Sequence, residues 1–120
     1  MPCLKIVTNL PKTKIPVDFV NKIIPVLSKS VKKAPEKFIC IVTPDSPISF
    51  GGESTSPGAI ATLESIGNLG VNENKVIAKE VSAFVEKELG IHQDRFFLTF
   101  YDVVNYNVAK GGLTINLVEP

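Results

Sequence analysis

Hydrophobic residues in this chain follow two patterns, which predict different elements. Short runs rich in β-branched and aromatic residues predict strands at residues 3–8, 38–43, 59–66 and 95–101. Apolar side chains that recur every three or four positions predict helices over residues 17–31 and 73–89, each with one buried face. The run GGLTINLV predicts a final short strand at residues 111–118.

The order of these elements repeats. Strand, helix and strand follow one another twice, so the chain divides into pseudo-repeats at about residues 2–57 and 58–120. Each helix is long enough to connect two parallel strands by a right-handed crossover. The two units can form one four-stranded mixed sheet with both helices on one face, an α/β fold that some schemes class as α+β. A length of 120 residues fits one domain over residues 1–120.

The predicted strands are apolar on both sides, as in the runs FICIV and RFFLTFY. Two helices can cover only one face of such a sheet. The other face is then left bare, and an exposed apolar surface of this size predicts association between chains.

Three residues mark features of the predicted helices. Pro25 interrupts the first helical pattern, where it removes one backbone hydrogen bond and bends the axis. Asn72 is placed to cap the start of the second helix. Gly90 is placed to end that helix in a left-handed conformation.

Composition narrows the classes of function. The chain has 44% hydrophobic residues and a net charge of +1, which does not favour a nucleic-acid partner. The only local excess of charge is the lysine cluster of residues 29–37, which by itself fits a solvated surface. Cys3 and Cys40 lie in apolar runs and are expected as buried free thiols. Neither a signal peptide nor a run of about 20 apolar residues is present, so we expect a cytoplasmic protein without membrane insertion.

Side chains with obvious catalytic chemistry are scarce. The single histidine, His92, follows the second helix and is expected in an exposed loop. The glycines of FGGESTSPG lack the lysine and the spacing of a phosphate-binding loop. No metal site and no cofactor site is predicted.

Pro2 is the remaining candidate. A proline suits the first position of a strand, which is its simplest explanation. If Met1 is removed, however, Pro2 becomes a secondary amine that can act as a base. Burial and a nearby cation would lower its pKa, and Lys32 or Lys33 could supply that cation.

A set of short motifs gives this chain a resemblance to a known family. In order, these motifs are MP at the start, TNLP at 8–11, KAP at 33–35, PD at 44–45, FGG at 50–52, SIG at 65–67, EN at 73–74, KELG at 87–90 and DR at 94–95. Their order and intervals resemble the macrophage migration inhibitory factor and D-dopachrome tautomerase family. The resemblance implies a doubled βαβ fold and a homotrimer whose three sheets form a central barrel.

The resemblance also implies an activity. Members of the family catalyse keto–enol tautomerisation of small aromatic α-keto acids, such as phenylpyruvate, and of dopachrome esters, without a cofactor. Pro2 matches the catalytic base of the family, and Lys33 matches the lysine that binds a carboxylate or carbonyl oxygen. Ile66 matches a residue whose backbone N–H contacts the substrate, and Val108 matches an apolar wall.

Four candidate substrate-binding positions depart from the pattern. Phe97 and Thr99 stand where the family has a tyrosine and an asparagine, which the neighbouring subunit contributes. Lys37 replaces a tyrosine and adds a second cation, and Lys110 stands near the place of a tryptophan. The Cys-x-x-Cys of the cytokine branch is absent at residues 58–61, so no thiol activity is implied.

Three functions are therefore compared. The first is a cofactor-independent tautomerase that also has cytokine-like activity. The second is a non-catalytic, cytokine-like protein with a vestigial pocket, secreted without a signal peptide, whose partner is a cell-surface receptor. The third is a trimer with neither role.

Overall fold

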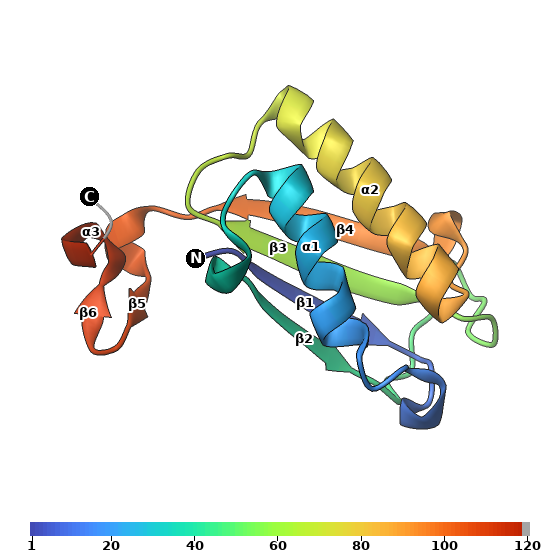
Figure 1. Cartoon of the computed structure of the whole chain (residues 1–120). Coiled ribbons are helices and arrows are strands. Elements are labelled where there is room, and N and C mark those ends of the chain that lie inside the picture. Colours follow the sequence, from blue (N-terminus) through green and yellow to red (C-terminus); the bar gives the residue numbers. More distant parts are fainter. Residues whose placement is uncertain (119–120) are drawn as a thin grey trace.

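A computed structural model describes residues 1–118 and shows a mixed sheet with two long helices on one face (Figure 1). Residues 119–120, the end of the predicted second unit, lie outside the described residues. The strands are β1 (Cys3–Thr8), β2 (Ile39–Thr43), β3 (Ala59–Ser65) and β4 (Phe96–Asp102). The long helices are α1 (Phe19–Val31) and α2 (Val71–Leu89). Short 3-10 turns occupy Lys12–Lys14, Pro35–Lys37, Gln93–Arg95 and Asn105–Asn107.

The sheet has the order β2-β1-β3-β4. β1 and β2 are parallel, as are β3 and β4, whereas β1 and β3 are antiparallel. Each parallel pair is connected by one helix, so the predicted pair of βαβ units and the predicted four-stranded mixed sheet are confirmed.

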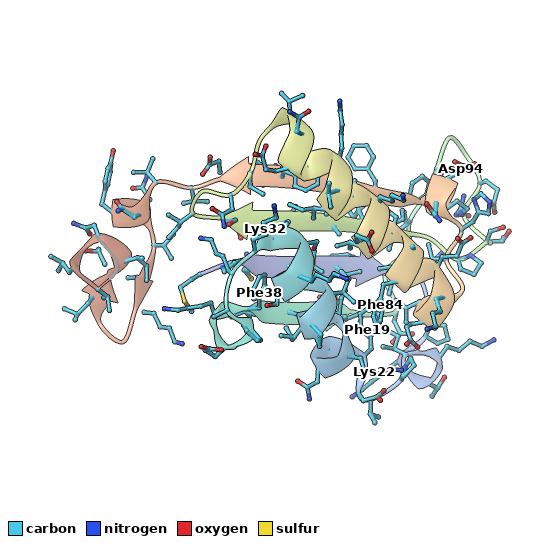
Figure 2. All side chains as sticks on the ribbon, turned by 45° about the horizontal axis from the view of Figure 1, so that its top comes forward. Phe19, Lys22, Lys32, Phe38, Phe84 and Asp94 are labelled. Carbon is cyan, nitrogen blue, oxygen red and sulfur yellow. The ribbon has the colours of Figure 1, made fainter. Side chains whose placement is uncertain are left out.

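The core lies between the sheet and the two helices. Leu4 and Leu63 face each other across β1 and β3 and are fully buried, as is Leu27 on α1. Phe19 is the first residue of α1, and its ring lies 5.8 Å from the ring of Phe84 in α2 (Figure 2). This contact joins the two helices. Burial of such side chains supplies the main stabilisation of the fold.

The observed features of the helices agree only in part with those predicted from the sequence. α1 continues through Pro25, which is exposed. The carbonyl that Pro25 leaves without a partner belongs to Asn21, which is also exposed and therefore accessible to water. The prediction of Asn72 as the N-cap was wrong, because α2 begins earlier and Gly70 takes that position. Gly90 ends α2 at φ 68°, as predicted.

The predicted strand at 111–118 was also wrong in most of its length. After β4 the chain forms two short antiparallel strands, β5 (Ala109–Lys110) and β6 (Leu113–Thr114), and then one helical turn, α3 (Ile115–Val118). Gly111 and Gly112 have φ of 65° and 82°, which is the turn geometry that glycine adopts without strain. Figure 1 shows this C-terminal hairpin extending beyond the end of the sheet where the chain begins.

The face of the sheet opposite the helices is bare. Every second side chain of the strands points to it, and large apolar groups there are half exposed: Ile39, Ile41, Ile60, Phe97 and Tyr101. This exposed apolar face is the surface that the sequence predicted. The two cysteines are free, and both are half-buried rather than fully buried.

Candidate active site

The first residues of the chain are held at the end of the sheet. Pro2 is buried immediately before β1. Its carbonyl oxygen accepts a hydrogen bond of 3.0 Å from the backbone N–H of Ile39, at the start of β2. Pro2 is therefore fixed by backbone pairing, and a terminal amine at this residue would occupy a defined position.

Lys33 reaches the same region from the end of α1. Lys32 ends the helix in the left-handed conformation, at φ 62° and ψ 49°, and this turns the chain toward β2. Ser28 Oγ then donates a hydrogen bond of 2.6 Å to the carbonyl oxygen of Lys33. The ammonium group of Lys33 donates to the carbonyl oxygen of Ile66, which lies just beyond β3, at 2.5 Å.

The loop after β3 is tied to three elements. Asn68 Nδ2 donates to the carbonyl oxygens of Val31 at 3.0 Å and Lys32 at 3.2 Å, in the last turn of α1. The N–H of Gly67 donates to Asp102 Oδ1, at the end of β4, at 3.0 Å. Ser65 Oγ, at the end of β3, donates to the carbonyl oxygen of Gly67 at 2.8 Å. The acceptor of the Lys33 ammonium therefore belongs to a well-anchored loop.

Several positive charges surround the chain terminus. Burial is the largest cause of the lowered pKa of the Met1 amine, because desolvation disfavours the charged form. Nearby cations lower this pKa further, and they belong to Lys33, Lys37 and Lys110. The environment thus favours a neutral terminal amine.

The pKa of Lys33 itself is also lowered. Burial is again the largest cause, and the charge of Lys37 adds to it. The carboxylate of Asp102 acts in the opposite direction and favours the charged lysine.

Two cavities meet at Met1. The larger, of about 420 Å³, is lined by Met1, Glu36, Lys37, Lys110, Gly111, Ile115 and Val118. The smaller, of about 120 Å³, is lined by Met1, Cys3, Glu64, Ser65, Ile66, Val103 and Val108. Both cavities are lined by Met1, so loss of Met1 would enlarge the space next to the new terminal residue, Pro2.

Most of the predicted site residues lie at this end of the molecule. They are Pro2, Lys33, Lys37, Ile66, Val108 and Lys110. The carbonyl group of Ile66 accepts a hydrogen bond from Lys33, and the contact of the Ile66 backbone N–H with a substrate stays a prediction.

Phe97 and Thr99 lie elsewhere in the chain's own structure. They line a groove of about 400 Å³ on the bare face of the sheet. The strand register explains this separation: Cys3 pairs with Glu64, which pairs with Tyr101, so Phe97 lies toward the opposite end of β4. A site that contains both Pro2 and Phe97 therefore needs a second copy of the chain.

Four residues near the site were not predicted from the sequence. Glu36 and Ile115 line the larger cavity, Asn68 anchors the loop beside Lys33, and Asp102 acts on Lys33 electrostatically. Asp102 directly follows an apolar run, which is a weak signal of a strand end. Ile115 lines the same cavity as Met1 because of the path of the C-terminal hairpin. The local sequence around Ile115 does not indicate this path.

Other kinds of site find little support in residues 1–118. No group of three or more His, Cys, Asp and Glu side chains among them could hold a metal ion. No helix within the described part is long and apolar enough to cross a membrane. The imidazole of His92 is 68% exposed and accepts a hydrogen bond of 3.1 Å from the N–H of Asp94, which fits its predicted place in a loop.

Together these features define a class of protein. Two βαβ units in one mixed sheet, with a buried proline at the second position, have the fold of the tautomerase superfamily. The family model "Macrophage migration inhibitory factor (MIF)" matches residues 1–116, and the chain belongs to this family.

Individual relatives agree with this assignment. Macrophage migration inhibitory factor of Xenopus tropicalis is 31% identical over 114 residues, covering 95% of this chain and 98% of the relative. MIF-like protein mif-2 of Caenorhabditis elegans is 29% identical over 115 residues, covering 96% of this chain and 95% of the relative. The solved structure of the factor from Trichinella spiralis has a TM-score of 0.88 and 27% identity, covering 93% of this chain and 98% of that one.

Proposed function

We propose that this protein is a cofactor-independent keto–enol tautomerase that acts on small aromatic α-keto acids of the phenylpyruvate or dopachrome type. Pro2, freed of Met1, is the base, and Lys33 binds the substrate oxygen. The observation that carries this proposal is the environment of the Met1 amine, next to Pro2, whose pKa is lowered by burial and by the charges of Lys33, Lys37 and Lys110. A base must be neutral to accept a proton, and burial and nearby cations both favour the neutral form of an amine.

The reaction is a proton transfer between two atoms of one substrate. In the keto-to-enol direction the Pro2 nitrogen takes a proton from the carbon beside the carbonyl group. The electron pair of the broken C–H bond forms the C=C bond, and the carbonyl oxygen gains negative charge. The ammonium of Lys33 stabilises that charge, and the protonated Pro2 then delivers the proton to the oxygen. Ketonisation follows the same path in reverse.

The proposal includes a homotrimer. The apolar face that bears Ile41 and Phe97 is half exposed in the single chain, and a second copy would remove it from water. The same association would bring Phe97 and Thr99 of a neighbour toward Pro2, as the resemblance implies. Phe97 keeps an aromatic surface there but lacks the hydroxyl donor of a tyrosine.

A second role is cytokine-like signalling, which the names of the relatives support. For this role the partner is a cell-surface receptor, the protein leaves the cytoplasm without a signal peptide, and the pocket is not required. The two roles are compatible, and they differ in their response to changes at Pro2.

The test is ultraviolet-monitored ketonisation of enol phenylpyruvate by protein whose N-terminus has been verified by mass spectrometry. Pro2→Gly should reduce kcat/KM by about 10²- to 10⁴-fold, the usual contribution of a general base. Lys33→Met should reduce kcat/KM as well. Lys87→Met serves as the matched control, because Lys87 is exposed in the last turn of α2. Equal turnover by wild type and a folded Pro2→Gly variant would exclude Pro2 as the base. Receptor-dependent signalling that survives Pro2→Gly would support the second role.

A further inference from the structure

One peptide group just beyond β3 connects two charged side chains. The Lys33 ammonium donates a hydrogen bond of 2.5 Å to the carbonyl oxygen of Ile66. The backbone N–H of Gly67 donates a hydrogen bond of 3.0 Å to Asp102 Oδ1. That carbonyl and that N–H belong to the same peptide group, which joins Ile66 to Gly67. A single peptide therefore bridges a cation and a carboxylate that come from different parts of the chain.

The polarity of this arrangement is favourable at both ends of the peptide. The C=O and N–H groups of a trans peptide point in opposite directions, and the peptide bonds of the described residues are trans. The negative oxygen end of the peptide dipole thus faces the ammonium, and the positive N–H end faces the carboxylate. Hydrogen bonds to charged groups are stronger than neutral ones, and hydrogen bonds in series polarise one another. The charge of Asp102 therefore strengthens the bond that holds Lys33.

Backbone contacts fix Asp102 beside this peptide. Asp102 is the last residue of β4 and pairs with Ser65, the last residue of β3. The N–H of Val103 then donates a hydrogen bond of 2.9 Å to the carbonyl oxygen of Ser65. Gly67 has φ 75°, which glycine adopts without strain and which turns the chain back over the strand ends. The sheet thus positions both the carboxylate and the turn that the carboxylate binds.

The charged groups around Lys33 act in opposite directions. Burial is the largest cause of the lowered pKa of Lys33, the charge of Lys37 lowers it further, and Asp102 raises it. Lys33 in turn contributes to the lowered pKa of the Met1 amine. A neutral lysine would supply neither this effect on the terminal amine nor a positive charge for a substrate oxygen. The proposed reaction therefore needs Lys33 in its charged form.

We infer that Asp102 is a positioning residue for the proposed reaction, and that it acts on Lys33 through the peptide between Ile66 and Gly67. This inference rests on the proposed function, because that function assigns the substrate oxygen to Lys33. Asp102 holds the turn to which Lys33 is bound and keeps Lys33 in its charged form. The Ile66 carbonyl accepts from one of the three N–H groups of the ammonium, and the others can donate to a substrate oxygen.

The first test measures Lys33 itself, so that the result does not depend on turnover. The pKa of Lys33 is followed by NMR titration of protein without Met1 that carries ¹³C-labelled lysine. Asp102→Asn removes the negative charge but keeps an oxygen that can accept from Gly67. This variant should lower the pKa of Lys33 and move the Gly67 amide resonance. Asp94→Asn makes the same change of charge just before β4, at the other end of that strand, and should alter neither signal.

The second test is the pH dependence of kcat/KM for ketonisation of enol phenylpyruvate. Because Asp102 is exposed, Asp102→Asn should lower kcat/KM about threefold at neutral pH, as expected for one exposed charge pair. The loss should be larger at alkaline pH, where Lys33 gives up its proton sooner. The alkaline limb of the profile should move to lower pH by the same amount as the pKa of Lys33. Asp102→Ala also removes the acceptor and should in addition lower the urea midpoint of unfolding.

The outcomes separate the inference from the proposed function. An unchanged pKa of Lys33 in Asp102→Asn, or an equal decrease in Asp94→Asn, would overturn the inference even if phenylpyruvate is ketonised. A lower pKa of Lys33 without a matching shift of the alkaline limb would overturn the role of Asp102 in the reaction. A lower pKa of Lys33 in Asp102→Asn, combined with a wild type that ketonises no keto acid, would support the connection between Asp102 and Lys33 and refute the tautomerase proposal.

Discussion

Replacement of Asn68 by Ala should destabilise the protein at the junction that holds Lys33 in place. Asn68 lies in the loop after β3, and its amide group donates to the carbonyl oxygens of Val31 and Lys32. These carbonyls belong to the last turn of α1, where no further backbone N–H is available to them. Alanine removes both donors and leaves the backbone in place.

The magnitude has two contributions. A hydrogen bond of this kind stabilises a folded protein by about 1 kcal/mol, and partial access of water to the carbonyls reduces the sum for two bonds to about 1–2 kcal/mol. Asn68 also adopts φ 59°, which asparagine tolerates better than alanine and which costs alanine about 1 kcal/mol more. We therefore expect the free energy of unfolding to fall by about 2–3 kcal/mol.

Urea denaturation followed by circular dichroism measures this change, at one fixed protein concentration because the chain is proposed to associate. Asn72→Ala is the matched control, because Asn72 is exposed in the first turn of α2, and it should change the stability by about 0.5 kcal/mol or less. The ketonisation assay should show a lower kcat/KM for Asn68→Ala as well, since Lys33 directly follows the residues to which Asn68 donates. Equal stabilities of the two variants would refute the anchoring role of Asn68.

Three further predictions concern the core, the long loop and the bare face. Leu27→Ala should lower the free energy of unfolding by about 2–5 kcal/mol in urea titrations, because Leu27 has 0% exposure and its loss leaves a cavity; a change below about 1 kcal/mol would contradict the packing. Hydrogen bonds from Thr55 and Ser56 hold the pKa of Glu53 at about 2, below its ordinary 4.5. The stability that Glu53 contributes is therefore complete above pH 4.5 and lost as the pH falls through 2, so the stability difference between wild type and Glu53→Gln should shrink over that window. Phe97→Lys should convert the proposed trimer to smaller species in analytical ultracentrifugation, since Phe97 is 62% exposed on the bare face; a trimer that remains intact in this variant would place the interface elsewhere.

The sequence predicted the sheet and both long helices because their signals are local. The periodic apolar residues of α1 and α2, and the β-branched run Ile39–Thr43, specify element types without reference to distant contacts. Gly90 was recognisable for the same reason, since a glycine after a helical pattern commonly adopts positive φ.

Distant contacts explain the error at the C-terminus, whereas a local contact explains the error at the start of α2. The run that includes Leu113, Ile115 and Leu117 alternates in polarity as a strand does, but no neighbouring strand of the main sheet pairs with it. Its backbone instead bends at two glycines, and the N–H of Ile115 donates to the carbonyl oxygen of Val108 at 2.8 Å. At the start of α2, the N–H of Gly70 donates to the side chain of Asn74 at 3.2 Å, and the helix begins before Asn72.

Some features of the candidate site could be predicted from local motifs, and others depend on the whole fold. Pro2 and Lys33 are marked by motifs, and the structure brings both to one end of the sheet. The separation of Phe97 from Pro2 follows from strand register, which no single segment of sequence contains.

The proposed function requires that the environment of the terminus makes Pro2 a neutral base. The most direct measurement is a pH titration of the Pro2 nitrogen by NMR, on protein without Met1 that carries ¹⁵N-labelled proline. We expect a pKa clearly below that of the same nitrogen in the urea-unfolded chain, because burial and Lys33 disfavour the charged amine. A pKa equal to or above the unfolded value would contradict the claim.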